Sequence, residues 1–151
     1  MAVLTFDLDD DYTLIGIHST EEDYKLAYIL NKHLNFRFTR YKENLDFKTS
    51  KAEYPLFEFK DDCSLINYYL INNKYKLVIE NKDNEGLFGG NYSTLEYLLP
   101  EKKRVDYFLK IEGSCNASTF KLVNDLNKIN QIITSYTINI NDLKSKDHLI
   151  F

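Results

Sequence analysis

The chain has 151 residues, of which 44% are hydrophobic, 15% aromatic and 28% charged, and its formal net charge is −4. A chain of this length buries about 70% of the surface that its unfolded form exposes, so it needs neither disulfides nor metals to fold. Its five glycines and two prolines exclude collagen-like and linker-rich classes, and the hydrophobic content excludes a disordered one. We therefore expect a single domain over residues 1–151.

The sequence favours a cytoplasmic location. Its start, MAVLTFDLDDDY, is acidic and lacks the basic segment and long apolar core of a secretory signal. No window approaches the roughly 18 uninterrupted apolar residues that a membrane helix requires, so we expect no membrane partner. Cys63 and Cys115 lie far apart, and we expect both to be small buried hydrophobic residues rather than a disulfide or metal pair.

The first elements in chain order are a strand, a helix and a strand. Residues 12–18 form a short apolar run that predicts a strand. Residues 19–23 then place hydroxyl side chains three positions before carboxylates, which is the spacing of a capping box. The following helix has an apolar stripe and is expected to end near Leu34. Alternation over residues 36–40 predicts the next strand.

The middle of the sequence has the character of strands. Asp61 and Asp62 suit a hairpin turn between the first two of them, and Pro55 places the first at an edge or at its own start. A loop over residues 81–93 collects three of the five glycines, and Pro100 cuts the last strand short. The predicted strands are residues 54–60, 65–72, 75–79 and 95–99.

The second half ends as the first begins, with a strand, a helix and a strand. The strands are predicted at residues 105–112 and 132–140, and a helix capped by Asn116 or Ser118 lies between them. Because strand connections through a helix are right-handed, both helices are expected on the same face of one sheet. The sequence thus predicts an α+β, two-layer domain: a mostly antiparallel sheet with two helices on one face, ferredoxin-like in character with added strands.

The sequence contains no complete enzyme motif. Residues 3–10, VLTFDLDD, look like the first motif of the haloacid dehalogenase phosphatases, in which Asp7 and Asp9 would be nucleophile and acid. The Gly-Thr that should follow is replaced by Asp10-Asp11, and the aspartate run lacks the glycine and closing glutamate of a calcium loop. The three histidines lack ligand spacing, and no phosphate-binding or nucleophile-elbow motif occurs. We therefore expect no catalytic residue, no metal and no cofactor.

A nucleic-acid partner is also disfavoured. Lys102, Lys103 and Arg104 stand beside Tyr107 and Phe108 and resemble a basic and aromatic patch. A net charge of −4 works against a phosphate-binding surface, because neutralising phosphates supplies most of the affinity for nucleic acid. The two aromatic residues alternate with aliphatic ones, which is the pattern of a sheet core.

Residues 99–107 read LPEKKRVDY and resemble the signature of the IPExxxVDY family, a family of uncharacterised bacterial proteins found largely in Bacteroidetes. Leu99 replaces the isoleucine, which is a conservative change. The resemblance extends over the whole chain, from the YTLIGIHS strand to the TSYTINI strand and the closing LKSKDHLIF. It implies a cytoplasmic, single-domain protein of about this size, and it supplies no catalytic residues because the family has no established activity.

Two interpretations of the signature stay open. In the first it is a structural corner, in which Pro100 fixes the direction of the chain and Glu101 accepts hydrogen bonds from turn N–H groups. In the second it is a recognition patch made of Pro100, Glu101, Arg104, Asp106 and Tyr107. Asp106 and Tyr107 then point to opposite faces of the following strand.

These observations predict a non-enzymatic protein-interaction or accessory module that offers a sheet edge or the acidic N-terminal segment to an unidentified protein. A homodimer is left open as one form of this partnership. The alternative is a small-molecule-binding regulatory domain of the ACT type, which rests on the way ferredoxin-like sheets dimerise around ligands.

Overall fold

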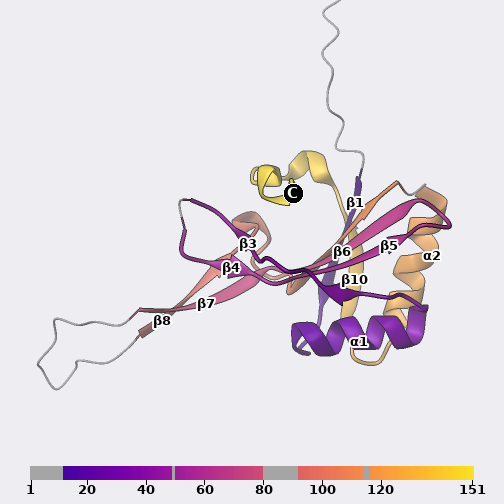
Figure 1. The fold of residues 1–151 in the computed structure, drawn as a ribbon, viewed down its shortest axis with the longest axis horizontal. Helices are drawn as coiled ribbons and strands as arrows, with labels where there is room; N and C mark the ends of the chain where they lie inside the picture. The colour runs from indigo at the N-terminus through magenta and orange to yellow at the C-terminus, as the bar shows by residue number, and fades with distance from the viewer. Residues whose placement is uncertain (1–11, 49, 80–91, 114–115) are drawn as a thin grey trace, which may run out of the picture.

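The computed structural model describes residues 12–48, 50–79, 92–113 and 116–151 (Figure 1). These residues form an α+β structure with a mostly antiparallel sheet and two α-helices. The acidic segment at residues 7–11 and most of the loop predicted at 81–93 lie outside the described residues. The elements in chain order are β1 (Tyr12–His18), α1 (Asp23–Leu34), β2 (Thr39–Arg40), β3 (Leu45–Asp46), β4 (Glu53–Tyr54), β5 (Leu56–Asp61), β6 (Ile66–Asn72), β7 (Lys74–Ile79), β8 (Tyr92–Tyr97), the 3₁₀ helix η1 (Pro100–Lys102), β9 (Tyr107–Glu112), α2 (Asn116–Asn127), β10 (Thr134–Ile138), and the 3₁₀ helices η2 (Ile140–Asp142) and η3 (Lys146–Leu149).

The main sheet has six strands in the order β10-β1-β9-β6-β5-β2, and each neighbouring pair is antiparallel. β1 and β9 lie in the middle and pair in a register that places Ile15 opposite Leu109. Both strands are buried on both sides, which explains why their sequences are nearly continuous apolar runs. The pairs β3-β4 and β7-β8 form separate two-stranded sheets.

One face of the main sheet packs against both α-helices. Ile15 of β1 and Leu109 of β9 belong to the same buried cluster as Leu30 of α1 and Leu126 of α2. The helical periodicity of the sequence therefore identified the correct buried stripes, and both helices cover the same face.

The opposite face is covered by irregular chain, which the two-layer prediction missed. Leu14 of β1 and Phe108 of β9 form a second buried cluster with Tyr54, Leu143 and Leu149. Figure 1 shows the segment after β10, here called the C-terminal segment (residues 139–151), on the side of the sheet away from α1. The sheet consequently has an apolar core on each face.

Lys110 shows how closely the C-terminal segment covers the second face. Its side chain lies in the middle of β9 and is only 4% exposed. Its Nζ donates a hydrogen bond to the Leu149 carbonyl at 2.7 Å, lies 3.0 Å from a Glu112 carboxylate oxygen, and stands 4.3 Å from the centroid of the Phe151 ring. A carbonyl, a carboxylate and an aromatic ring together compensate for the lost hydration of the ammonium. Lys110 is therefore a buried lysine whose charge is compensated by distant parts of the chain.

The strand predicted at residues 36–40 shrinks to the two residues of β2. The reason lies at Phe38, whose ring is buried under α1. The Asn31 side chain of α1 accepts a hydrogen bond from the Phe38 N–H at 2.8 Å and donates one to its carbonyl at 3.2 Å. An amide side chain thus occupies the backbone groups that a neighbouring strand would otherwise pair.

The capping box predicted before α1 does not form. Glu22 is the N-cap residue and makes no side-chain capping bond. The Ser19 hydroxyl instead accepts a hydrogen bond from the Glu21 N–H at 3.2 Å and donates one to the Gln131 carbonyl at 2.8 Å. Ser19 therefore connects the start of the helix to the chain before β10, a tertiary contact that local spacing does not reveal.

The predicted strands at residues 75–79 and 95–99 form a hairpin of their own and do not join the main sheet. The second of them begins earlier, at Tyr92, and ends at Tyr97. Leu98 and Leu99 leave the strand because both side chains are completely buried in the second core cluster. The last predicted strand, at residues 132–140, is likewise shortened to the five residues of β10.

Gly113, directly after β9, offers a test of this packing. It has a φ of +86°, and a Cβ added there would lie 2.8 Å from the Leu65 carbonyl oxygen. Left-handed strain costs an L-residue about 1–2 kcal/mol, and a clash with backbone adds to it. We expect Gly113→Ala to lower the free energy of unfolding by about 2 kcal/mol or more in urea titrations.

Leu65 supplies the control for this prediction, because it has a φ of +57° and is 81% exposed. Asparagine tolerates the left-handed region better than leucine, so Leu65→Asn should leave the stability unchanged or slightly raised. A Gly113→Ala protein as stable as the wild type would contradict the account of this turn.

Candidate functional site

The signature segment (residues 99–107) is held by the buried side chain of Asn73, which lies between β6 and β7. Asn73 is completely buried. Its Nδ2 donates hydrogen bonds to the carbonyls of Lys102 at 2.9 Å and Val105 at 2.8 Å, and its Oδ1 accepts one from the Leu99 N–H at 2.9 Å. The signature therefore wraps around one amide side chain, here called the Asn73 hub. Sequence reasoning did not single out this residue.

The backbone of Asn73 and the side chain of Asp106 extend the same network. The Asn73 N–H donates to the Asp106 carbonyl at 3.0 Å, and the Asn73 carbonyl accepts from the Leu98 N–H at 2.8 Å. One Asp106 carboxylate oxygen accepts a hydrogen bond from the Ser19 N–H at 3.0 Å, and the other lies 2.6 Å from the Lys74 Nζ. Asp106 thus joins the chain before α1 to the first residue of β7.

Tyr107 points into the core beneath the helices. Its ring is 5% exposed, and its hydroxyl donates a hydrogen bond to the Glu21 carbonyl at 2.5 Å. Burial raises the pKa of the Tyr107 phenol far above its ordinary value, and the nearby carboxylates of Asp23 and Asp106 raise this pKa further. The phenol therefore remains a neutral donor that anchors the start of α1 and is unsuited to act as a base.

Glu101 ties the signature to the C-terminal segment. One of its carboxylate oxygens accepts hydrogen bonds from the N–H groups of Lys144 at 2.9 Å and Ser145 at 2.7 Å. Burial alone raises the pKa of the Glu101 carboxyl, but the hydrogen bonds from Ser145 and Lys144 outweigh it and hold the pKa below its ordinary value. The carboxylate does accept backbone N–H groups, as the sequence suggested, but they come from a distant part of the chain.

The two remaining candidate residues face solvent. Pro100 is exposed at the first position of η1, where its missing N–H leaves no hydrogen bond unmade, and Arg104 is exposed in the bend before β9. Glu101, Asp106 and Tyr107 hence bind other parts of this chain, as the structural-corner interpretation requires. A recognition role for the five residues together stays a prediction.

Metal-ligand clusters and membrane helices are two features that the described residues lack. Among residues 12–48, 50–79, 92–113 and 116–151, no three histidine, cysteine or acidic side chains are grouped to hold a metal ion. In the same ranges, no helix has both the length and the apolar character needed to cross a bilayer. Cys63 is exposed, which corrects the expectation that it is buried; Cys115 lies outside the described residues.

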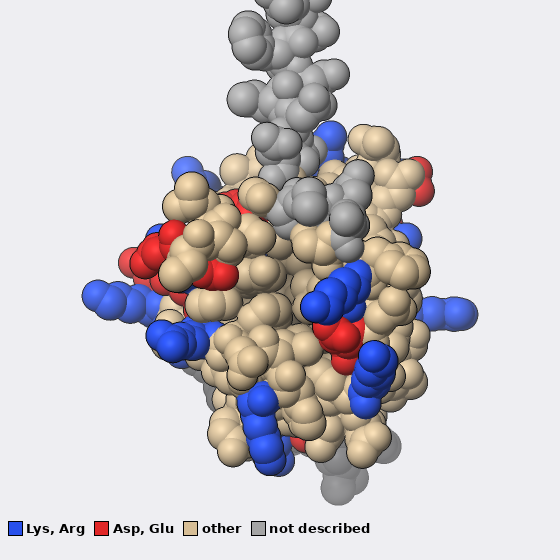
Figure 2. Space-filling view, turned by 90° about the vertical axis from the view of Figure 1, so that its right-hand side faces the viewer, with Lys and Arg blue, Asp and Glu red and all other residues tan. Residues whose placement is uncertain are grey.

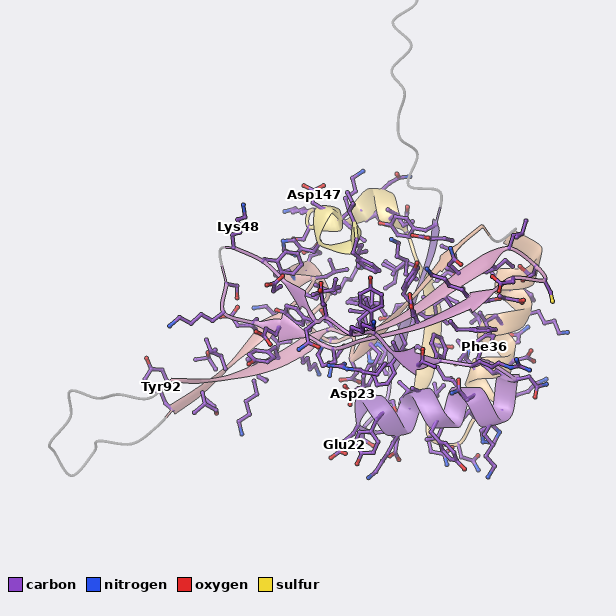
Figure 3. The ribbon with its side chains drawn as sticks, in the orientation of Figure 1. Glu22, Asp23, Phe36, Lys48, Tyr92 and Asp147 are labelled. Carbon is purple, nitrogen blue, oxygen red and sulfur yellow. The ribbon has the colours of Figure 1, made fainter. Side chains whose placement is uncertain are left out.

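The most unusual surface feature is the β7–β8 hairpin, here called the arm. It projects away from the main sheet in Figure 1, and Figure 3 shows Tyr92 far out along it. Val78 pairs with Ser93 and Lys76 with Leu95, so Val78 and Leu95 lie on one face and Tyr92 on the other. These three apolar side chains are 56%, 54% and 51% exposed. An isolated two-stranded hairpin is at best marginally stable in water, which makes apolar exposure on both faces notable.

The edges of the main sheet offer fewer free backbone groups for pairing with an added strand than the arm does. At the β10 edge, the Ser135 N–H donates to the Asn127 Oδ1 at 2.7 Å, and the Asn127 Nδ2 donates to the Ser135 carbonyl at 3.2 Å. The amide of Asn127 therefore satisfies both groups that an added strand would need at this position. At the other edge, β2 offers a ladder of only two residues.

Comparison of this chain with protein-family models, with curated proteins and with solved structures finds no match. Its function is inferred below from its own contacts and exposed surfaces.

The Glu101 contact predicts a pH dependence of stability. Because the pKa of Glu101 is lower in the folded state, its carboxylate stabilises the fold above the unfolded pKa of about 4.3. This contribution is lost as the pH falls through the folded-state pKa. We expect Glu101→Gln to cost about 1 kcal/mol at neutral pH, and this difference from the wild type to vanish in strong acid.

Urea titrations of the wild type and Glu101→Gln at neutral and acidic pH measure this difference. Glu43→Gln, a change of the same chemistry at an exposed glutamate, is the matched control and should have little effect at either pH. A Glu101→Gln difference that is equally large at both pH values would show that the charge of Glu101 does not matter.

Proposed function

We propose that this chain is a cytoplasmic, non-enzymatic protein-interaction or accessory module whose arm binds another protein. The observation that carries the proposal is the half-exposed apolar surface of Val78, Leu95 and Tyr92 on a projecting hairpin. Burying such side chains favours association by about 25 cal/mol for each Å² removed from water. The acidic N-terminal segment, which the sequence also suggested as a docking element, lies outside the described residues.

A partner strand added to the arm is the contact that the geometry favours. Among the described strands, β8 pairs with β7 alone, so its outer edge is available for main-chain hydrogen bonds. A strand added there would lie beside Leu95 on one face and Tyr92 on the other. It would also convert a two-stranded hairpin into a three-stranded sheet, which is the smallest sheet with independent stability.

The order of elements supports a ferredoxin-like interpretation of the fold. β1, α1, β6, β9, α2 and β10 follow the β-α-β-β-α-β order, and β5 and β2 extend the sheet beyond β6. The resemblance of residues 99–107 to the IPExxxVDY signature supports membership of that family, and the Asn73 side chain binds the backbone of Leu99 and Val105 within this segment. Neither resemblance supplies an activity, so the function rests on the arm.

Affinity purification of the tagged chain from its native host, followed by mass spectrometry, is the first part of the test. We expect a protein partner in fixed stoichiometry with the wild-type chain. The identified partner is then purified and titrated into the wild type and into Val78→Asp/Leu95→Asp. Two charges in place of the exposed apolar side chains of Val78 and Leu95 should weaken binding by about tenfold or more.

Ile133→Asp is the matched control, because Ile133 is an equally apolar side chain, 69% exposed, that lies away from the arm just before β10. Its binding should stay within about twofold of the wild type. Full binding by Val78→Asp/Leu95→Asp would contradict the proposal. A chain that carries a bound metabolite and no protein would instead favour the ACT-like alternative.

A further inference from the structure

A cavity of about 260 Å³ opens between the end of α1, the side of α2 and the strands β6 and β9. It is lined by Phe36, Tyr68, Ile111 and Leu122, here called the floor, and by Ser118, Thr119, Lys121 and Asp125, here called the rim. Figure 3 shows Phe36 at the end of α1 that faces α2. The cavity is remote from the arm and from the signature segment, so it serves neither of the features described above.

The floor is shaped for a flat apolar group. The rings of Phe36 and Tyr68 lie 4.7 Å apart at an angle of 36°, and Phe59 stacks on Tyr68 at 5.5 Å with an interplanar angle of 12°. These rings are held rigidly because they pack against the core cluster beneath the helices. Aromatic walls of this kind favour aromatic guests, which pack against them by offset or edge-to-face contacts.

The charged side chains at the rim favour a negatively charged ligand. Lys121 is exposed, and within the described part of the chain its ammonium has neither an ion pair nor a hydrogen bond. Asp125, one helical turn along, lies 4.0 Å from the Lys128 Nζ, so its charge is partly balanced. The ammonium of Lys121 therefore remains at the mouth of the cavity as a positive charge that can bind an anionic ligand. Figure 2 views this end of the molecule and shows basic and acidic side chains interspersed. Among the described residues, this face therefore has no continuous basic surface of the kind that binds a large polyanion.

Tyr68 adds a neutral donor to the lining. Its hydroxyl makes no hydrogen bond to any of the described residues. Burial, and to a smaller extent the charge of Asp61, raises the pKa of the Tyr68 phenol, so the group keeps its proton at neutral pH. A carboxylate at the mouth would meet the ammonium of Lys121, while the neutral Tyr68 adds no negative charge to the lining.

The volume limits the size of the guest. An apolar cavity of roughly 150 Å³ is sufficient for benzene, so 260 Å³ accommodates one ring with a short side arm. Sites for drug-sized ligands and cofactors are larger, at about 300–1,000 Å³. We propose that this cavity binds a small aromatic monocarboxylate, with its ring against Phe36, Tyr68 and Leu122 and its carboxylate at Lys121. This inference goes beyond the proposed protein interaction and does not depend on it.

The test titrates 3-phenylpropionate into the full chain and follows the methyl signals of Ile111 and Leu122 by NMR, with Leu149 on the opposite face as the internal control. A ligand with so few atoms is expected to bind with a Kd in the millimolar range. We expect the Ile111 and Leu122 signals to shift and the Leu149 signals to stay in place. Unchanged Ile111 and Leu122 signals at about 10 mM ligand would overturn the proposal.

The charge is tested by two lysine variants and a neutral ligand. Lys121→Gln should weaken binding of 3-phenylpropionate about fivefold, whereas Lys144→Gln, which changes a lysine of the C-terminal segment outside this cavity, should change it by less than about twofold. Binding of 3-phenylpropionamide should be the same in both variants. Both lysines are exposed, so neither variant is expected to lose its fold. Equal affinity of Lys121→Gln and the wild type for the acid would overturn the assignment of a carboxylate ligand.

Discussion

The hydrogen bonds of one buried asparagine side chain hold together the parts of this structure that the sequence keeps far apart. Asn73 uses its side chain to bind Leu99, Lys102 and Val105, and its backbone to bind Leu98 and Asp106. Each bond replaces contact with water for groups that are now buried, and an unpaired group in such a place costs about 1–3 kcal/mol. The amide therefore fixes the path of the signature segment, and that path sets where β9 enters the middle of the sheet.

The Asn73 hub also positions the surface on which the proposed function depends. β7 begins at the residue after Asn73, and Leu98, which donates to the Asn73 carbonyl, directly follows β8. Both strands of the arm are thus tied to the same buried residue at their roots, while their outer parts expose apolar side chains. A rigid root with an exposed arm suits docking, because little conformational freedom is lost on binding. Glu101 and Asp106 extend the same anchoring to the C-terminal segment and to the start of α1.

The elements that follow from local pattern were predictable, and those that depend on distant partners were not. β1 was predicted with its observed bounds, and α1 and β9 were predicted with their observed ends, because continuous apolar runs and a helical stripe report burial directly. Both α1 and β9 begin two or three residues later than predicted. β2 was predicted too long, since nothing local shows that Asn31 takes the backbone groups of Phe38. The same reason explains the buried Lys110, whose charge is compensated by Leu149 and Phe151 from the far end of the chain. Of the signature, the sequence predicted that Glu101 accepts backbone hydrogen bonds, but it did not reveal their donors or the Asn73 hub.

The direct test of this account is the free energy of unfolding of Asn73→Ala compared with Asn72→Ala, the same substitution one residue earlier. Asn72 is partly exposed, and its side chain accepts a hydrogen bond from the Lys74 N–H. The account predicts a loss of about 3 kcal/mol or more for Asn73→Ala, because three buried backbone groups lose their partner, and about 1 kcal/mol or less for Asn72→Ala. Equal losses for the two variants would contradict the central role of the Asn73 hub.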